Sequence, residues 1–190
     1  MNQQNPYPTI FSIPLFRQEF SLDNESITSF SLLRKQIDNG RTISNVGGWQ
    51  SNEFNLRKPP KELKELSKCI LDFSLDICNF MGIEPVSGGT GWINVNENGH
   101  FNWSHTHPQS ALSGVYYVKT SSNSGDIEFE NPSMNLMTNI KVKSYNIFNS
   151  SSFQVPSEMG IMYIFPSWLP HKVHPNLSDQ ERISISFNLK

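Results

Sequence analysis

Residues 89–120, GTGWINVNENGHFNWSHTHPQSALSGVYYVKT, carry the pattern that decides the fold. Apolar and polar side chains alternate along this stretch, and Gly, Pro, Asn and Ser divide it into short segments. Alternation with a period of two is typical of strands that have one apolar and one polar face. The same texture continues to the end of the chain with no helical segment between the strands. This excludes parallel crossover units and leaves an antiparallel double sheet or barrel.

Seven segments after residue 88 have this texture, and we predict seven or eight strands from them. They are GWINVN (91–96), HFNWSHTH (100–107), ALSGVYYVKT (111–120), DIEFEN (126–131), NIKVKSYNIF (139–148), EMGIMYIFP (158–166) and RISISFNL (182–189).

The last segment shows how the two faces differ. One side carries only polar residues and the other only apolar ones; the polar set is Arg182, Ser184, Ser186 and Asn188. Such a polar face lies either in solvent or in the interior of a barrel, and the alternation alone leaves both open. The positions of the histidines favour the interior.

Two helices are predicted before the strands, after a short extended segment, TIFSIPLF (9–16). The first covers residues 24–37, where Asn24 or Ser26 could provide the N-cap. The second covers residues 61–83 and follows Pro60. Its apolar residues recur at helical spacing: Leu63, Leu66, Ile70, Phe73, Ile77 and Phe80. Neither helix contains a histidine, so we interpret both as scaffold that packs on the apolar outer face of one sheet.

Length and composition limit the function further. The chain has 190 residues, which suit one domain, with a helical buttress at residues 1–88 and a β core at 89–190. Its formal charge is −2, which argues against a non-specific nucleic-acid binder. It has no run of eighteen apolar residues and no signal peptide at its start, so we expect a cytoplasmic protein with no membrane partner. Cys69 and Cys78 lie about 13 Å apart along one helix and cannot pair with each other.

All five histidines follow residue 99: His100, His105, His107, His171 and His174. In a strand, His105 and His107 point to the same side, so their two imidazoles can share a metal ion. The alternative is a pair of surface histidines. In an extended FPSWLPHKVHP segment, His171 and His174 face opposite ways, and we favour His171 as the third ligand.

Arg182 follows eleven residues after His171, and Ser184 lies on the same strand face. A guanidinium and a hydroxyl inside a sheet need an anionic partner, and a carboxylate matches the guanidinium fork. An organic acid is therefore the natural occupant. The alternative is an arginine that pairs locally with Glu181 or Asp179.

Together these motifs resemble the Fe(II)- and 2-oxoglutarate-dependent dioxygenases. The resemblance rests on HTHPQSALSGVYYV (105–118), SGDIEFENP (124–132), FPSWLPHKVHP (165–175) and RISISFN (182–188). More narrowly, they are similar to a group of 2OG-Fe(II) oxygenases in which H-x-H-P and FPSWLxHxVxP recur, and the likeness spans residues 89–190. It implies a mainly β fold with two N-terminal helices, namely a double-stranded β-helix of the jelly-roll or cupin-like kind. It also implies Fe(II) and the cosubstrate 2-oxoglutarate.

The resemblance makes His105 and His171 metal ligands. It implies no catalytic residues beyond the ligands, and it assigns five residues to cosubstrate binding: Arg182, Ser184, Asn94, Asn96 and Tyr116. The chain departs from the family pattern at His107, where a carboxylate is usual. Either three imidazoles form the site, which strand geometry favours, or a carboxylate from elsewhere completes it. Asp126 and Glu128 are the nearest candidates for that carboxylate.

The activity implied is hydroxylation of a peptide or a small molecule, with release of succinate and CO2. A homodimer is compatible with this interpretation. Several aromatic and polar residues are candidates for the mouth of the site: Trp49, Gln50, Trp103, Tyr116 and Trp168. The alternative is a cupin-like protein that binds a metal and an organic acid without turnover. Gly99, then five residues, then H-T-H (105–107) matches the start of the first cupin motif, although the glutamate expected after it is missing.

Overall fold

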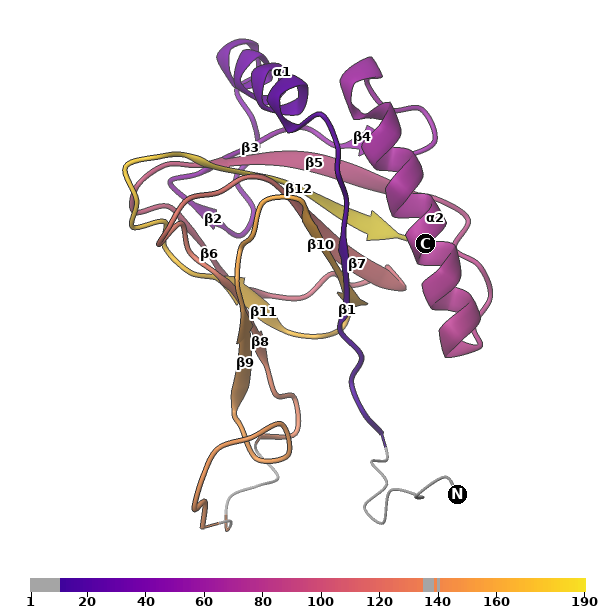
Figure 1. The fold of residues 1–190 in the computed structure, drawn as a ribbon, viewed down its shortest axis with the longest axis vertical. Coiled ribbons are helices and arrows are strands. Elements are labelled where there is room, and N and C mark those ends of the chain that lie inside the picture. Colours follow the sequence, from indigo (N-terminus) through magenta and orange to yellow (C-terminus); the bar gives the residue numbers. More distant parts are fainter. Residues whose placement is uncertain (1–10, 135–138, 140) are drawn as a thin grey trace.

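The computed structural model describes residues 11–134, 139 and 141–190, and its strands form two antiparallel sheets (Figure 1). The larger sheet has the order β1 (Phe16–Glu19), β10 (Ile161–Pro166), β7 (Leu112–Lys119), β12 (Arg182–Leu189), β5 (Gly89–Asn96) and β3 (Trp49–Gln50), and β4 (Phe54–Asn55) also pairs with β5. The smaller sheet has the order β2 (Asn45–Val46), β6 (Phe101–His105), β11 (His171–Val173), β8 (Ile127–Glu130) and β9 (Ser152–Val155). Together they form the predicted double-stranded β-helix.

Both predicted helices are present on the outer side of the larger sheet (Figure 1). Helix α1 spans Asn24–Ile37, and its N-cap is Asp23 rather than Asn24 or Ser26. A carboxylate oxygen of Asp23 accepts a hydrogen bond from the Ser26 amide at 3.0 Å, which satisfies one free donor of the first turn. A 3-10 turn at Lys61–Leu63 leads into helix α2, which spans Lys64–Met81.

The main apolar core lies between these helices and the larger sheet. The helices contribute Ile27, Leu66, Ile70 and Ile77, among others, while β12 contributes Ile183, Ile185, Phe187 and Leu189. The polar side of β12 lies on the opposite face of the sheet, where its residues line a cavity inside the barrel. The polar face of β12 is therefore interior, which decides for this strand between the two alternatives left by the sequence.

One predicted strand is wrong. Residues 141–148 form bends and turns, and residue 140 lies outside the described residues. The edge of β8 is instead taken by β9, which pairs from Ile127↔Val155 to Glu130↔Ser152. Tyr145, Ile147 and Phe148 are mostly exposed, so the apolar residues that suggested a strand are not buried against a sheet. The extended segment at 9–16 is also shifted: β1 begins only at Phe16, and residues 9 and 10 lie outside the described part.

Two further expectations concern thiols and membranes. Cys69 and Cys78 are both free, and both lie on α2. Among the described residues, no helix has the length and apolar character needed to cross a bilayer.

The packing of α2 on the sheet gives a direct test of the fold. Ile70 is fully buried, so Ile70→Ala should lower the free energy of unfolding by about 2–5 kcal/mol, through lost transfer energy and a cavity. Leu75 on the same helix is 45% exposed, and Leu75→Ala should cost less than about 1 kcal/mol. Urea denaturation followed by circular dichroism measures both. Equal losses in the two variants would contradict this placement of α2.

Candidate active site

Three histidines gather at one place inside the barrel. One ring nitrogen from each of His105, His107 and His171 lies within 4.8 Å of the others. The ring centroids are 4.5 Å apart for His105 and His171, 5.0 Å for His105 and His107, and 5.1 Å for His107 and His171. This is the spacing of three imidazoles that converge on one point.

Strand pairing brings the three rings together. His105 is the last residue of β6 and lies directly opposite His171, the first residue of β11. His107 is beyond the end of β6, where its amide donates to the carbonyl of Ser167 at 2.9 Å. That bond ties the segment after β6 to the turn before β11, so all three rings face the same space.

Hydrogen bonds to the ring nitrogens orient two of the rings. Nδ1 of His105 is 2.7 Å from the carbonyl oxygen of Trp103, and Nδ1 of His171 is 2.9 Å from that of Leu169. A carbonyl oxygen can only accept, so Nδ1 carries the proton in both rings and Nε2 keeps its lone pair. Among the described residues no group hydrogen-bonds either Nε2. Such a backbone bond on the opposite nitrogen is usual for imidazoles that bind metals.

Burial keeps the cluster uncharged. It lowers the pKa of His107 to about 4 and that of His171 to about 3, and it also lowers the pKa of His105. Neutral imidazoles at neutral pH are the form that binds a metal ion. The donor set therefore fits a divalent transition metal such as Fe(II), although imidazoles alone do not select between metals.

The three histidines line a cavity of about 370 Å³ that also contains Arg182. The guanidinium is almost completely buried, with 1% of the residue exposed. Its Nη1 donates to the carbonyl oxygens of Ser124, Gly125 and His174, the last two at 2.8 Å and 3.3 Å. Burial lowers the pKa of Arg182, but an arginine stays charged at neutral pH. Among the described residues no carboxylate forms an ion pair with this cation, so its charge is available to an anion in the cavity.

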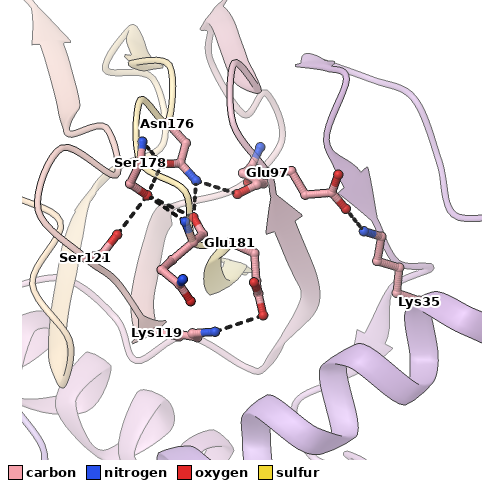
Figure 2. Close-up of polar contacts among 9 residues, drawn as sticks. Lys35, Glu97, Lys119, Ser121, Asn176, Ser178 and Glu181 are labelled. Atoms are coloured by element: carbon pink, nitrogen blue, oxygen red, sulfur yellow. Dashed lines mark hydrogen bonds and ion pairs between the residues drawn. The ribbon is translucent and has the colours of Figure 1, made fainter.

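The local partners that the sequence allowed for Arg182 are engaged elsewhere or not in contact. Glu181 pairs with Lys119 at 2.9 Å, as Figure 2 shows. No ion pair with Asp179 is formed within the described part of the chain. The alternative of a local ion pair for Arg182 is therefore wrong.

A buried asparagine holds together the loop that precedes β12 (Figure 2). The side-chain amide of Asn176 donates to the carbonyl oxygens of Asn96 and Gln180, at 2.9 Å and 2.7 Å, while its Oδ1 accepts from the amide and hydroxyl of Ser178. These bonds connect the end of β5 to the loop before β12. Arg182 and Asn96 are paired across the two strands, so this network supports the base of the cavity.

Most of the predicted cosubstrate residues line the cavity, but one does not. Asn94, Asn96 and Ser184 line it together with Arg182. Tyr116 lies on the opposite face of β7, where it packs in the helix-side core and its hydroxyl donates to Oδ1 of Asn24 at 2.9 Å. The prediction for Tyr116 is therefore wrong, because strand alternation sends it away from the cavity.

Tyr117, the neighbour of Tyr116, lines the cavity instead, although the sequence analysis did not assign it to the site. Burial raises the pKa of Tyr117, so its hydroxyl is neutral and can donate a hydrogen bond, and the nearby Arg182 opposes that shift. Two consecutive tyrosines in GVYYVKT give the sequence no means of choosing between them. The register of β7 against β12 makes the choice, since Tyr117 lies opposite Ser184 and Tyr116 opposite Ile185.

The two carboxylates proposed as alternative ligands are not at the histidine cluster. Asp126 accepts from the Ser157 amide and from Nε2 of Gln154, both at 3.0 Å. Glu128 lies 2.6 Å from Nε2 of His174 and pairs with Lys172 at 3.3 Å. His174, which directly follows β11, thus contacts Glu128 and takes no part in the histidine cluster. His100 accepts from the Glu97 amide at 3.0 Å and takes no part in the cluster.

Of the residues predicted at the mouth of the site, some line the cavity and others do not. Gln50 and Trp103 line the cavity, and 65% of Trp103 is exposed. Trp49 packs in the helix-side core, and Trp168 lies outside the cavity lining. Trp92 was not predicted, but it lines the cavity, and its ring centroid is 5.8 Å from that of His107.

Comparisons with known structures support the fold. The chain is similar to a prolyl-4-hydroxylase from Pseudomonas putida, with a TM-score of 0.67 and 14% identity over 94% of this chain and 93% of that one. It is also similar to a prolyl hydroxylase from Trichoplax adhaerens in complex with a peptide fragment of the hypoxia inducible factor oxygen degradation domain. There the TM-score is 0.64 and the identity 15%, over 92% of this chain and 82% of that one. For the non-heme alpha-ketoglutarate-dependent carbocyclase SnoK from nogalamycin biosynthesis, the TM-score is 0.61 and the identity 12%, over 93% of this chain and 79% of that one. At these identities the likeness shows the fold alone.

Family membership rests on a separate finding. A search of curated proteins finds no match. The model of a family described as "Putative 2OG-Fe(II) oxygenase" matches residues 90–188, which contain the three histidines and Arg182. That match covers more than half of the chain. The protein therefore belongs to this family of 2-oxoglutarate- and Fe(II)-dependent oxygenases.

Proposed function

We propose that the protein hydroxylates a C–H bond of a peptide or small molecule, using Fe(II) held by His105, His107 and His171. In this proposal Arg182 binds the distal carboxylate of 2-oxoglutarate, and succinate and CO2 are released. The observation that carries the proposal is the presence of three neutral imidazoles and one uncompensated guanidinium in the same cavity.

Each residue has a role that follows from its surroundings. One ring nitrogen from each of the three imidazoles lies close to the other two, so these residues would hold the metal at the wall of the cavity that would take the cosubstrate. Arg182 donates from the edge of its guanidinium that the backbone carbonyls do not occupy. The hydroxyls of Tyr117 and Ser184 line the same cavity and can donate to the same carboxylate. When bound, Fe(II) supplies the redox chemistry that couples decarboxylation of the keto acid to oxidation of the substrate.

The outer part of the cavity supports this choice of substrate class. Trp103 and Ile43 both line it and are both largely exposed, so an apolar surface is available beside the histidines. A large exposed aromatic at the opening suits a peptide or a small apolar molecule. The Trichoplax adhaerens relative in complex with a peptide adds support for a peptide.

The proposed reaction has a direct test. Purified protein is incubated with Fe(II), 2-oxoglutarate and a cell extract under ¹⁸O₂. Succinate should be released, and the mass of one component of the extract should rise by about 18 units, the mass of one inserted ¹⁸O atom. Mass spectrometry measures both products. Binding of Fe(II) and 2-oxoglutarate without any succinate release under air would instead indicate the alternative, a binding protein without turnover.

The third ligand can be separated from its alternative by two substitutions. His107→Ala should reduce the metal content well below one per chain, because two imidazoles remain of three. Asp126→Asn should leave the metal content near one, because the Asp126 carboxylate is bonded to Ser157 and Gln154 rather than to the histidine cluster. Metal analysis after anaerobic loading measures both. The reverse result would replace His107 with Asp126 as the ligand.

The role of Arg182 predicts a loss of cosubstrate affinity. Arg182→Ala should raise the dissociation constant of 2-oxoglutarate by about tenfold or more, given about 2–5 kcal/mol for a truncated buried charge pair. Arg17→Ala is the matched control, since Arg17 is half exposed and pairs with Glu158 at the surface. Anaerobic calorimetry of the Mn(II)-loaded protein gives the constants. Unchanged affinity in Arg182→Ala would remove this residue from the cosubstrate site.

A further inference from the structure

Gly125 lies in the turn between β7 and β8, against the guanidinium of Arg182. Its backbone has a φ of +86°, a conformation that side chains with a Cβ rarely adopt. Its own carbonyl is one of the three that accept from Nη1 of Arg182, and the Ser124 carbonyl beside it is another. This turn therefore contributes two of the three acceptors that hold one side of the guanidinium.

A methyl group at position 125 would collide with the guanidinium of Arg182 and with carbonyl oxygens around it. A Cβ on Gly125 would lie 2.6 Å from Nη1 of Arg182 and 2.7 Å from the carbonyl oxygen of Pro175, and closer still to that of His174. The His174 carbonyl is the third acceptor of Nη1. Since two of these obstacles are backbone atoms, a side chain could be accommodated only if the carbonyls or the guanidinium moved.

Gly99 provides a comparison within the same chain. Its φ is +80°, so its backbone requirement matches that of Gly125. A Cβ at Gly99 would meet nothing within 4 Å. Any difference between equal substitutions at the two sites therefore reports the contacts around Arg182 rather than the cost of the backbone conformation.

We propose that Gly125 is a positioning residue for 2-oxoglutarate: the absence of a side chain lets the Ser124, Gly125 and His174 carbonyls hold Nη1 of Arg182, and this aims the guanidinium at the cosubstrate. The inference rests on the proposed function, in which Arg182 binds the distal carboxylate. The three carbonyls occupy one nitrogen, and among the described residues nothing hydrogen-bonds the remaining guanidinium donors, so they are available to a ligand in the cavity that Arg182 lines. A shift of the guanidinium would weaken its pairing with a carboxylate, because a bidentate pair depends on geometry as well as charge.

The test compares Gly125→Ala with Gly99→Ala in the full chain. With Mn(II) in place of Fe(II), the dissociation constant of 2-oxoglutarate should rise about tenfold or more in Gly125→Ala and by less than about twofold in Gly99→Ala. The affinity for Mn(II) alone should stay within about twofold of the parent in both variants, because neither residue contacts the histidine cluster. Equal 2-oxoglutarate constants in the two variants would overturn the proposal.

A double substitution shows whether Gly125 acts through Arg182. The constant for Gly125→Ala combined with Arg182→Ala should equal that for Arg182→Ala alone, since the group being positioned is gone. A further tenfold loss in the double variant would show that Gly125 acts independently and would also overturn the proposal. If Arg182→Ala itself leaves the constant unchanged, the proposed function fails at this residue, which is a different result from failure at Gly125.

Loss of folding is distinguished by a second pair of variants. Asn tolerates positive φ better than other residues with a Cβ, so Gly125→Asn and Gly99→Asn carry less backbone strain. Thermal melting of all four variants identifies those that fold. The dissociation constants of 2-oxoglutarate are then compared between the two Ala variants and between the two Asn variants, wherever both members of the pair fold. If neither Gly125 variant folds while both Gly99 variants do, Gly125 is required for the fold itself and its assignment to cosubstrate binding is overturned.

Discussion

The antiparallel pairing of β6 with β11 is the interaction on which the site depends. It places His105 directly opposite His171, two residues that are 66 positions apart in the chain. The bond from the His107 amide to the Ser167 carbonyl then holds the chain beyond β6 beside the turn that precedes β11. Because both contacts are between backbone groups, the cluster is built by the sheet, and the imidazoles need only point inward.

The inward face of the larger sheet is polar along β12 and apolar along β7 and β10. The outward side of the sheet packs on α1 and α2, so the helices cover the surface that would otherwise need a second apolar sheet. The opposite side can then carry Arg182, Ser184 and Asn94 into the cavity. A buried guanidinium is costly when it is unpaired. The carbonyls around Nη1 accept hydrogen bonds from part of the Arg182 guanidinium. Its other donors and its charge remain for an anionic ligand in the cavity.

The replacement of a carboxylate by His107 changes the charge of the site. A cluster of three neutral imidazoles cancels none of the charge of a divalent metal, and Arg182 adds a further positive charge in the same cavity. Asp126 and Glu128 are bonded elsewhere, so they do not restore the missing negative charge at the cluster. On the proposed function, the dianion 2-oxoglutarate is what balances this site, and metal and cosubstrate should therefore bind more tightly together than apart.

The sequence by itself determined the helices and the longer strands, because these depend on local periodicity. Strand spacing predicted that His105 and His107 share one side, but His107 lies beyond the end of β6, and its backbone bond to Ser167 places it beside the other two rings. Tertiary structure alone decided what periodicity cannot distinguish. The choice between Tyr116 and Tyr117 depends on register between strands, and the exclusion of Asp126 depends on its bonds to Ser157 and Gln154. The inward direction of the polar side of β12 was likewise decided by the helices that cover the outer face of the sheet, a contact between segments distant in the chain that no local pattern specifies.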